Sequence, residues 1–499
     1  MRWAVVLYVV IYRILTPPYV AAVAGDVNEL TILRAITDGA LEIMLIVPVI
    51  FMKRAGYFHP LVFPAFLLIA TNVAFAPAHL FLPFVVSTRL FATVSPSWAA
   101  VLIDLDPQNY AQYRIQFSIY SILYYASLYF FFFQQDKKAQ HIRSEVRERP
   151  AYLRYIPMSA FLVCMACVGI ALLLFRSSGG LEAHIVSLSK GRYETLSGSG
   201  VSISAVKAAI IALFAWMAGA KTLPLKSPMF ILTTLAVLPV VWIVDGSRST
   251  IIYAIIGLLA IAAIRMKRLP VATIVMAGVL GVALLGVLGS IRHDFTSTSV
   301  NTSVFDPANF GTWLETASTE IVERNAEEGD LAAFVAADRM GFIWGQSYLS
   351  VLAFPMPRII WENKPRTGHA YNTWVAFFGN PVDGDAPAAW GIPLGPIAEA
   401  YWNFGAVGIV LVGGTVGLIF GTLLAAFKRG SGRPELLVLY VIFLLYFSGG
   451  SRETQYVIQY GASLLAVFAL AMVIHAVLGG RSSRARGAAV PDLRQASPS

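Results

Sequence analysis

FPMPRIIWENKPRTGHAYNTW, residues 354–374, and WGIPLGPIAEAYWNFG, residues 390–405, precede the apolar run GAVGIVLVGGTVGLIFGTLLAAF, residues 405–427. The first two segments combine cations, aromatic side chains and prolines. The third is apolar over the length at which a helix spans a ~30 Å hydrocarbon core. This contrast predicts a membrane span that follows a polar region outside the bilayer. The polar region starts near residue 292, and no other polar region of this chain is as long, so chemistry is expected in it.

The composition places the whole chain in the membrane. Hydrophobic residues make up 57% and charged residues 13% of the 499 positions, and the mean hydropathy is +0.68. The surface of a soluble domain needs about twice that charge. Apolar runs of span length recur about twelve times, and a helix satisfies its own backbone in lipid. The sequence therefore predicts an all-α polytopic membrane protein of about twelve transmembrane helices.

The cations set the predicted orientation. Much of the net charge of +9 lies in short loops beside spans, above all in DKKAQHIRSEVRERPAYLR, residues 136–154. This is the positive-inside pattern, so we assign the charge to topology and expect no nucleic-acid partner. Both termini are predicted to be cytoplasmic. The A-x-A pattern at residues 22–24 leaves a cleaved signal peptide as the alternative to a first span.

Four regions follow from this topology. Residues 1–291 form a membrane domain with the first nine predicted spans, and residues 292–404 form one large periplasmic region that carries the candidate active site. Residues 405–478 hold the last three spans, and residues 479–499 are predicted to be a disordered, basic cytoplasmic tail. Within the large region, the acidic segment EIVERNAEEGD, residues 320–330, is expected to be a solvated helix face.

No metal or cofactor is expected. The D-x-D pairs at residues 104–106 and 383–385 have no histidine or further acid at ligand spacing, and the chain has no P-loop, G-x-S-x-G or H-E-x-x-H motif. Cys164 and Cys167 form a C-x-x-C inside an apolar span. A redox motif needs a soluble strand-to-helix context, so these two residues are interpreted as small core residues.

Two predicted outer hairpins repeat one pattern, GSRST at residues 246–250 and GSRET at residues 450–454. Arginine in a short outer turn opposes the positive-inside bias and therefore needs a reason. Arg248 and Arg452 could contact lipid headgroups or cap helices. Alternatively they bind an anionic ligand, because a guanidinium binds phosphate bidentately and Gly-Ser turns add donors. We favour the anionic ligand.

The polar outer segments also hold the candidate binding residues. Aromatic faces bind sugar rings and cations bind phosphate, so the mixture suits a glycan attached to a lipid phosphate. The alternative is an interfacial loop with a Trp/Tyr belt and headgroup cations. The candidates for substrate binding are Arg192, Arg292, Trp361, Lys364, Arg366, His369, Tyr371 and Asn403. Arg248, Arg358 and Arg452 are candidate catalytic residues.

Glu399 is the candidate acid. It lies just before the span at 405–427, and an acid that enters a membrane helix is costly unless it is paired or functional. At helical spacing Asn403 falls on the same face. Two roles remain open for Glu399: a general base toward a hydroxyl, or a structural counter-ion.

Between about residues 179 and 452 the sequence resembles a known family. The segments GGLEAHIVSLSKGRYETLSGSG, GSRST, FPMPRIIWENKPRTG and GPIAEAYWNFGAVGIVLVGGTVG, in that order, look like the Wzy-type O-antigen or oligosaccharide repeat-unit polymerases of bacteria. Arg248, Arg358 and Arg452 match the outer-loop arginines of that family, and Glu399 matches the acid of its E-x-Y-x-N-F-G segment. The family's R-x10-G pattern is one residue shorter here, from Arg358 to Gly368.

The resemblance implies a C-type membrane glycosyltransferase in the bacterial inner membrane. It would join oligosaccharide repeat units carried on undecaprenyl diphosphate at the periplasmic face, for O-antigen, capsule or exopolysaccharide synthesis, without a metal. The lipid bilayer and these lipid-linked oligosaccharides are the expected partners, and a chain-length regulator protein is a further one. An O-antigen ligase is the nearest alternative, since it uses the same donor. A lipid-linked glycan transporter or flippase is the alternative from another class, although the apolar spans are mostly free of polar residues.

Overall fold

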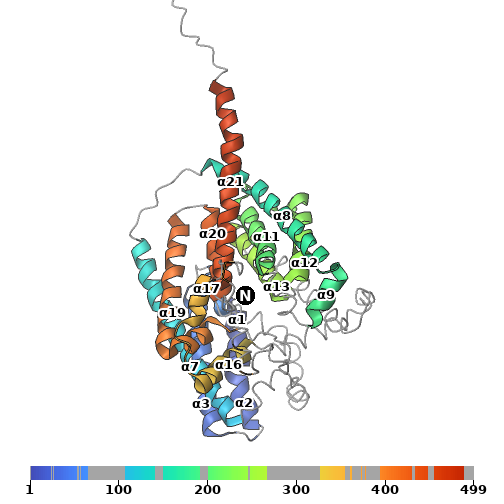
Figure 1. Ribbon diagram of the computed structural model, residues 1–499. Helices are drawn as coiled ribbons and strands as arrows, with labels where there is room; N and C mark the ends of the chain where they lie inside the picture. Colours follow the sequence, from blue (N-terminus) through green and yellow to red (C-terminus); the bar gives the residue numbers. More distant parts are fainter. Residues whose placement is uncertain are drawn as a thin grey trace, which may run out of the picture.

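The computed structural model describes only part of the chain. The described residues are 2–23, 25, 27–52, 56, 58–65, 107–140, 150–190, 200–245, 248–266, 326–353, 360–361, 373, 377, 394–429, 433–447 and 455–487. They form helices and turns, and no strand occurs among them (Figure 1). The all-α prediction is confirmed for this part of the chain.

Helices of membrane-spanning length dominate the described residues. Six segments are long and apolar enough to cross a bilayer: α7, η2 with α8, α11, α12, α19 and α21. The helices α13 and α20 are apolar but shorter. The chain is therefore a helical membrane protein. The number of twelve spans stays a prediction, because most of the predicted span at 61–85 and all of that at 271–291 lie outside the described residues. The helices are α1 (Arg2–Tyr8), η1 (Val9–Leu15), α2 (Thr16–Val23), α3 (Glu29–Phe51), α7 (Pro107–Gln140), η2 (Ala151–Tyr155), α8 (Ile156–Ser177), α9 (Leu181–Lys190), α11 (Gly200–Gly219), η3 (Pro224–Lys226), α12 (Pro228–Asp245), α13 (Arg248–Met266), α16 (Ala326–Met340), α17 (Gln346–Ala353), α19 (Pro396–Arg429), α20 (Pro434–Phe447) and α21 (Gln455–Gly487).

Helix pairs fix the relative directions of the spans. The two cysteines of α8 show one pair: Cys164 Sγ donates to the Ala209 carbonyl at 3.7 Å, and Cys167 Sγ to the Ala205 carbonyl at 3.0 Å. Rising numbers in α8 thus meet falling numbers in α11, so these helices are antiparallel, in agreement with the predicted alternation. Both cysteines are buried and free, which confirms their interpretation as core residues.

The helices α7 and α19 lie side by side and run parallel (Figure 1). Glycines of α19 face α7 one turn apart: a Cβ on Gly413 would lie 2.6 Å from the Tyr124 carbonyl oxygen, and one on Gly417 would lie 2.3 Å from that of Leu128. Gly421 continues the row against Phe132 and Gln135. Small residues at this spacing allow two membrane helices to approach at backbone distance.

Replacing Gly417 by alanine is expected to destabilise the protein by about 1–3 kcal/mol, because the new methyl group collides with backbone that cannot move aside. The matched control is Gly461→Ala in α21, where an added Cβ meets nothing within 4 Å. That control is expected to be neutral or to stabilise by up to about 1 kcal/mol through helix propensity. Thermal unfolding in detergent measures both, and equal midpoints for the two variants would contradict the close α7–α19 contact.

Helix α19 reverses direction at Gly405. This glycine has φ 62° and ψ −148°, which are not helical values. A Cβ on Gly408 would lie 2.4 Å from the Ala400 carbonyl oxygen, although eight residues of straight helix span about 12 Å. Residues 400 and 408 therefore face each other across a hairpin. We call residues 396–404 the half-helix; the spanning part of α19 follows it and begins where the span at 405–427 is predicted.

A loop from another part of the chain closes the half-helix. The break at Gly405 leaves the last carbonyls of the half-helix without their helical donors. The backbone N–H of Ile343 donates to the Trp402 carbonyl at 3.0 Å, and that of Trp344 to the Asn403 carbonyl at 3.1 Å. The segment between Gly341 and the start of α17 is thereby fixed against the end of the half-helix.

Helix α16 is buried against α7 and α19, and its first residues, up to Asp330, belong to the acidic segment expected to be solvated. Its residues 330–337 are all buried, and Phe334 stacks on Tyr401 with ring centroids 4.2 Å apart. Asp330 is 9% exposed, and its carboxylate accepts a hydrogen bond from the Gly395 backbone N–H. The expectation of a solvated face was thus wrong for Asp330, because this carboxylate caps the start of the half-helix; the side chains of residues 320–329 lie outside the described part.

Candidate functional site

The half-helix places Glu399 in a buried polar cluster. Ser347 Oγ donates to Glu399 Oε1 at 2.8 Å, and Asn403 Nδ2 donates to Ser347 Oγ at 2.8 Å. Asn403 Nδ2 also donates to the Glu399 carbonyl oxygen at 2.7 Å, as helical spacing requires. The three residues are 3%, 1% and 0% exposed for Ser347, Glu399 and Asn403. Charge-assisted hydrogen bonds of this kind orient a carboxylate in a medium of low dielectric.

Unsatisfied polar atoms surround this cluster. Asn403 Oδ1, the Tyr348 hydroxyl and the Tyr124 hydroxyl are buried and have no hydrogen-bond partner among the described residues. Burial raises the pKa of Tyr348 well above its usual value, and the Glu399 carboxylate and the Tyr124 hydroxyl raise it further. A buried polar group without a partner is costly. These atoms therefore keep unused hydrogen-bonding capacity beside the Glu399 cluster.

The structure describes few of the predicted site residues. Glu399 and Asn403 lie together as described, and Trp361 is 42% exposed. Arg248 is the first residue of α13, but its side chain lies outside the described residues. The other predicted site residues lie wholly outside them: Arg192, Arg292, Arg358, Lys364, Arg366, His369, Tyr371 and Arg452.

A buried ion pair joins three membrane helices close to the predicted GSRST turn. Lys207 Nζ of α11 lies 2.8 Å from Asp245 Oδ1, and both side chains are at most 5% exposed. The Thr250 hydroxyl of α13 donates to Asp245 Oδ2 at 2.7 Å. Ionisable residues inside a membrane domain are costly and usually functional or paired. Here the pair and the Thr250 hydrogen bond connect the end of α12 and the start of α13 to α11.

The far end of α13 is also held by α11. Arg265 donates to the carbonyl of Met217 and, at 2.7 Å, to that of Ala220. Met217 lies in the last turn of α11 and Ala220 directly follows the helix, where a cation is favourable because the helix dipole is negative there. The register between α11 and α13 is therefore fixed at both ends.

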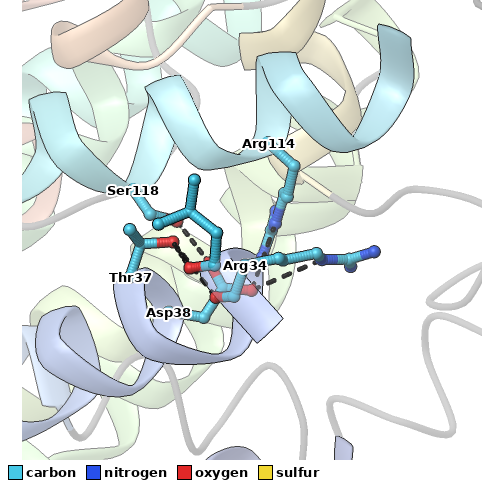
Figure 2. Close-up of polar contacts among 6 residues, drawn as sticks. Arg34, Thr37, Asp38, Arg114 and Ser118 are labelled. Carbon is cyan, nitrogen blue, oxygen red and sulfur yellow. Dashed lines mark hydrogen bonds and ion pairs between the residues drawn. The ribbon is translucent and has the colours of Figure 1, made fainter. Parts of the chain in front are cut away.

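A third polar cluster lies between α3 and α7 (Figure 2). The Ser118 hydroxyl donates to Asp38 Oδ1, and Asp38 Oδ2 lies 3.6 Å from Arg34 Nε and 3.8 Å from Arg114 Nε. Arg34 also covers the Tyr110 ring at 5.8 Å. The Asp38 carboxylate thus forms ion pairs with one arginine of its own helix and one of α7. These ion pairs connect the N-terminal halves of α3 and α7.

Sequence reasoning did not find Ser347 or the Lys207–Asp245 pair. Ser347 lies 52 residues before its partner Glu399, in a segment without any unusual residue, so no local signal marks it. The ion pair did leave a signal, since Lys207 and Asp245 are single opposite charges in two neighbouring apolar runs.

Comparisons of the chain with protein-family models, with curated proteins and with solved structures find no match.

Proposed function

We propose that the protein is a membrane glycosyltransferase that polymerises undecaprenyl-diphosphate-linked oligosaccharide repeat units at the outer face of the bacterial inner membrane. One observation carries the proposal: a reversed half-helix holds a buried carboxylate, Glu399, with Ser347 and Asn403. The half-helix ends where the predicted span at 405–427 begins, so its acid is expected at the outer edge of the membrane. The resemblance of residues 179–452 to repeat-unit polymerases supports the same residue, because Glu399 matches the acid of that family's E-x-Y-x-N-F-G segment.

The proposed reaction needs one base and one neutralised leaving group. A hydroxyl oxygen of the acceptor glycan attacks the anomeric carbon of the donor glycan, and the bond from that carbon to the diphosphate oxygen breaks. Glu399 takes the hydroxyl proton, and undecaprenyl diphosphate leaves with the bonding electron pair. Ser347 holds one carboxylate oxygen of Glu399 by its hydrogen bond at 2.8 Å, so the base is oriented before substrate binds.

Side-chain cations are proposed for the diphosphate. Arginine forks stabilise phosphate charge that develops in a transition state. Arg248, Arg358 and Arg452 are our candidates, on the grounds of their place in the sequence. Since arginines supply the positive charge, the reaction is expected to proceed without a divalent cation.

The proposal is tested with purified protein and undecaprenyl-diphosphate-linked repeat units extracted from the source bacterium, in detergent with EDTA. A ladder of lengthened glycans on a gel is the expected product. Heat-denatured protein is the control for carry-over of preformed chains. Intact substrate under these conditions, with folded protein and with or without added Mg²⁺, contradicts polymerisation.

Transport of a lipid-linked glycan is the second candidate, because two features favour it. Transporters use broken membrane helices at their binding sites, and α19 is broken at Gly405. The Lys207–Asp245 pair is a buried charge pair of the kind found on transport pathways. Proteoliposomes loaded with a fluorescent lipid-linked oligosaccharide separate the two activities: flipping without chain growth favours transport, and chain growth without flipping favours the polymerase.

A further inference from the structure

Trp344 has a backbone conformation that bulky residues avoid. Its φ is 48°, and it is the one residue other than glycine with positive φ in the described part of the chain. The left-handed region is sterically unfavourable for a residue with a large side chain. Such strain persists where the surroundings fix the backbone, and it clusters at ligand-binding positions.

The surroundings of Trp344 do fix its backbone. Its N–H donates to the Asn403 carbonyl at 3.1 Å, and it lies between Gly341 and Gly345, whose φ values of 81° and 85° are also left-handed. A Cβ on Gly345 would lie 2.8 Å from the Phe404 ring. The turn is therefore built tightly against the end of the half-helix, three residues before Ser347.

Burial of the ring does not offset this strain. Trp344 is 73% exposed, and its aromatic neighbour among the described residues is Phe342, at 6.0 Å and edge-on. Phe342 in turn packs edge-on against Tyr401 at 5.8 Å. The exposed indole thus stands on a rigid aromatic base, with its own surface available.

We propose that Trp344 stacks on a sugar ring of the glycan that binds at the Glu399 cluster, a proposal that rests on the function proposed above. The C–H bonds of a pyranose face carry partial positive charge, which complements the negative face of an indole. Asn403 connects the two sites: its side chain bonds Ser347, and its carbonyl holds Trp344. A tryptophan that only anchors the protein in the membrane interface needs no strained turn.

The test replaces Trp344 by asparagine, which tolerates left-handed backbone but has no ring, and by phenylalanine, which keeps a ring. Trp344→Asn is expected to raise the unfolding midpoint by about 1–2 °C, as strain is relieved. It is also expected to raise KM for the lipid-linked repeat unit about 5- to 10-fold, with little change in kcat. Trp344→Phe is expected to keep most of the affinity. The control is Trp3→Asn, which removes an indole that is 72% exposed in α1 and leaves KM unchanged.

A binding measurement distinguishes the proposal of stacking by Trp344 from the proposed polymerase function. Binding of the lipid-free repeat-unit oligosaccharide to the intact protein is measured by isothermal titration, without turnover. Weaker binding to Trp344→Asn than to wild type supports stacking even if no ladder forms. Equal binding to both proteins, no binding to wild type, or a lower midpoint with unchanged KM overturns it. A wild-type ladder with equal binding contradicts stacking alone, and the proposed function then stands.

Discussion

Replacing Glu399 by glutamine is expected to lower kcat for chain growth by about 10²- to 10⁴-fold, the usual contribution of a general base. Glutamine has nearly the same shape and still accepts the Ser347 hydrogen bond, which is 2.8 Å long, but it cannot take the acceptor proton. Because the cluster keeps its geometry, KM and the unfolding midpoint are expected to change little. The measurement is the initial rate of ladder formation at saturating substrate.

Two variants control this prediction. Glu399→Asp keeps the carboxylate, but the side chain is one methylene shorter and the carboxylate lies further from the acceptor hydroxyl. Partial activity is therefore expected. Glu435→Gln removes a carboxylate that lies near Arg433 at the start of α20, in the predicted cytoplasmic half, and full activity is expected. Unchanged kcat in Glu399→Gln would exclude the base and leave the role of structural counter-ion. A large fall in the unfolding midpoint instead of kcat would point the same way.

Breaking the Lys207–Asp245 pair is expected to give the largest loss of stability in the described membrane helices. Lys207→Met leaves the Asp245 carboxylate, which is 1% exposed, without its ammonium partner. Removing one member of a buried ion pair costs about 3–5 kcal/mol. Asp245→Asn is expected to cost a similar amount, because it removes the carboxylate that lies 2.8 Å from the Lys207 ammonium.

The double variant tests whether the pair itself causes that loss. Lys207→Met with Asp245→Asn removes both charges of this pair, and the asparagine oxygen still accepts from Thr250, whose hydroxyl lies 2.7 Å from Asp245 Oδ2. Replacing both members of a buried pair is often neutral, so the double variant is expected to be more stable than either single one. Thermal unfolding in detergent gives the comparison. Additive losses would show that the two side chains act independently.

The spanning helices and the face shared by Glu399 and Asn403 could be predicted because both depend on local pattern. An apolar run of span length shows a membrane helix, and a spacing of four residues shows a common face. The composition even placed the start of a span at Gly405, where α19 reverses. The reversal itself left no sign in the sequence, since it depends on the approach of Ala400 to Gly408 and on bonds from a distant loop.

The partners of the buried acids could not be predicted either, because they also lie far away in the sequence. The carboxylate of Asp330 meets a backbone N–H that lies 65 residues further along the chain. Read locally, an acidic segment is typical of a solvated face. Such contacts are set by tertiary packing, so neither periodicity nor composition encodes them.

Asp330 also has an electrostatic consequence for any anionic substrate. The half-helix begins beside Gly395, and the N-terminus of a helix carries a partial positive charge that attracts anions. In this protein, the carboxylate of Asp330 already occupies that position. A diphosphate would compete with Asp330 for this N-terminus, so its charge is expected to be balanced mainly by side-chain cations. Salt should consequently weaken substrate binding more steeply than it would at a site built from backbone amides.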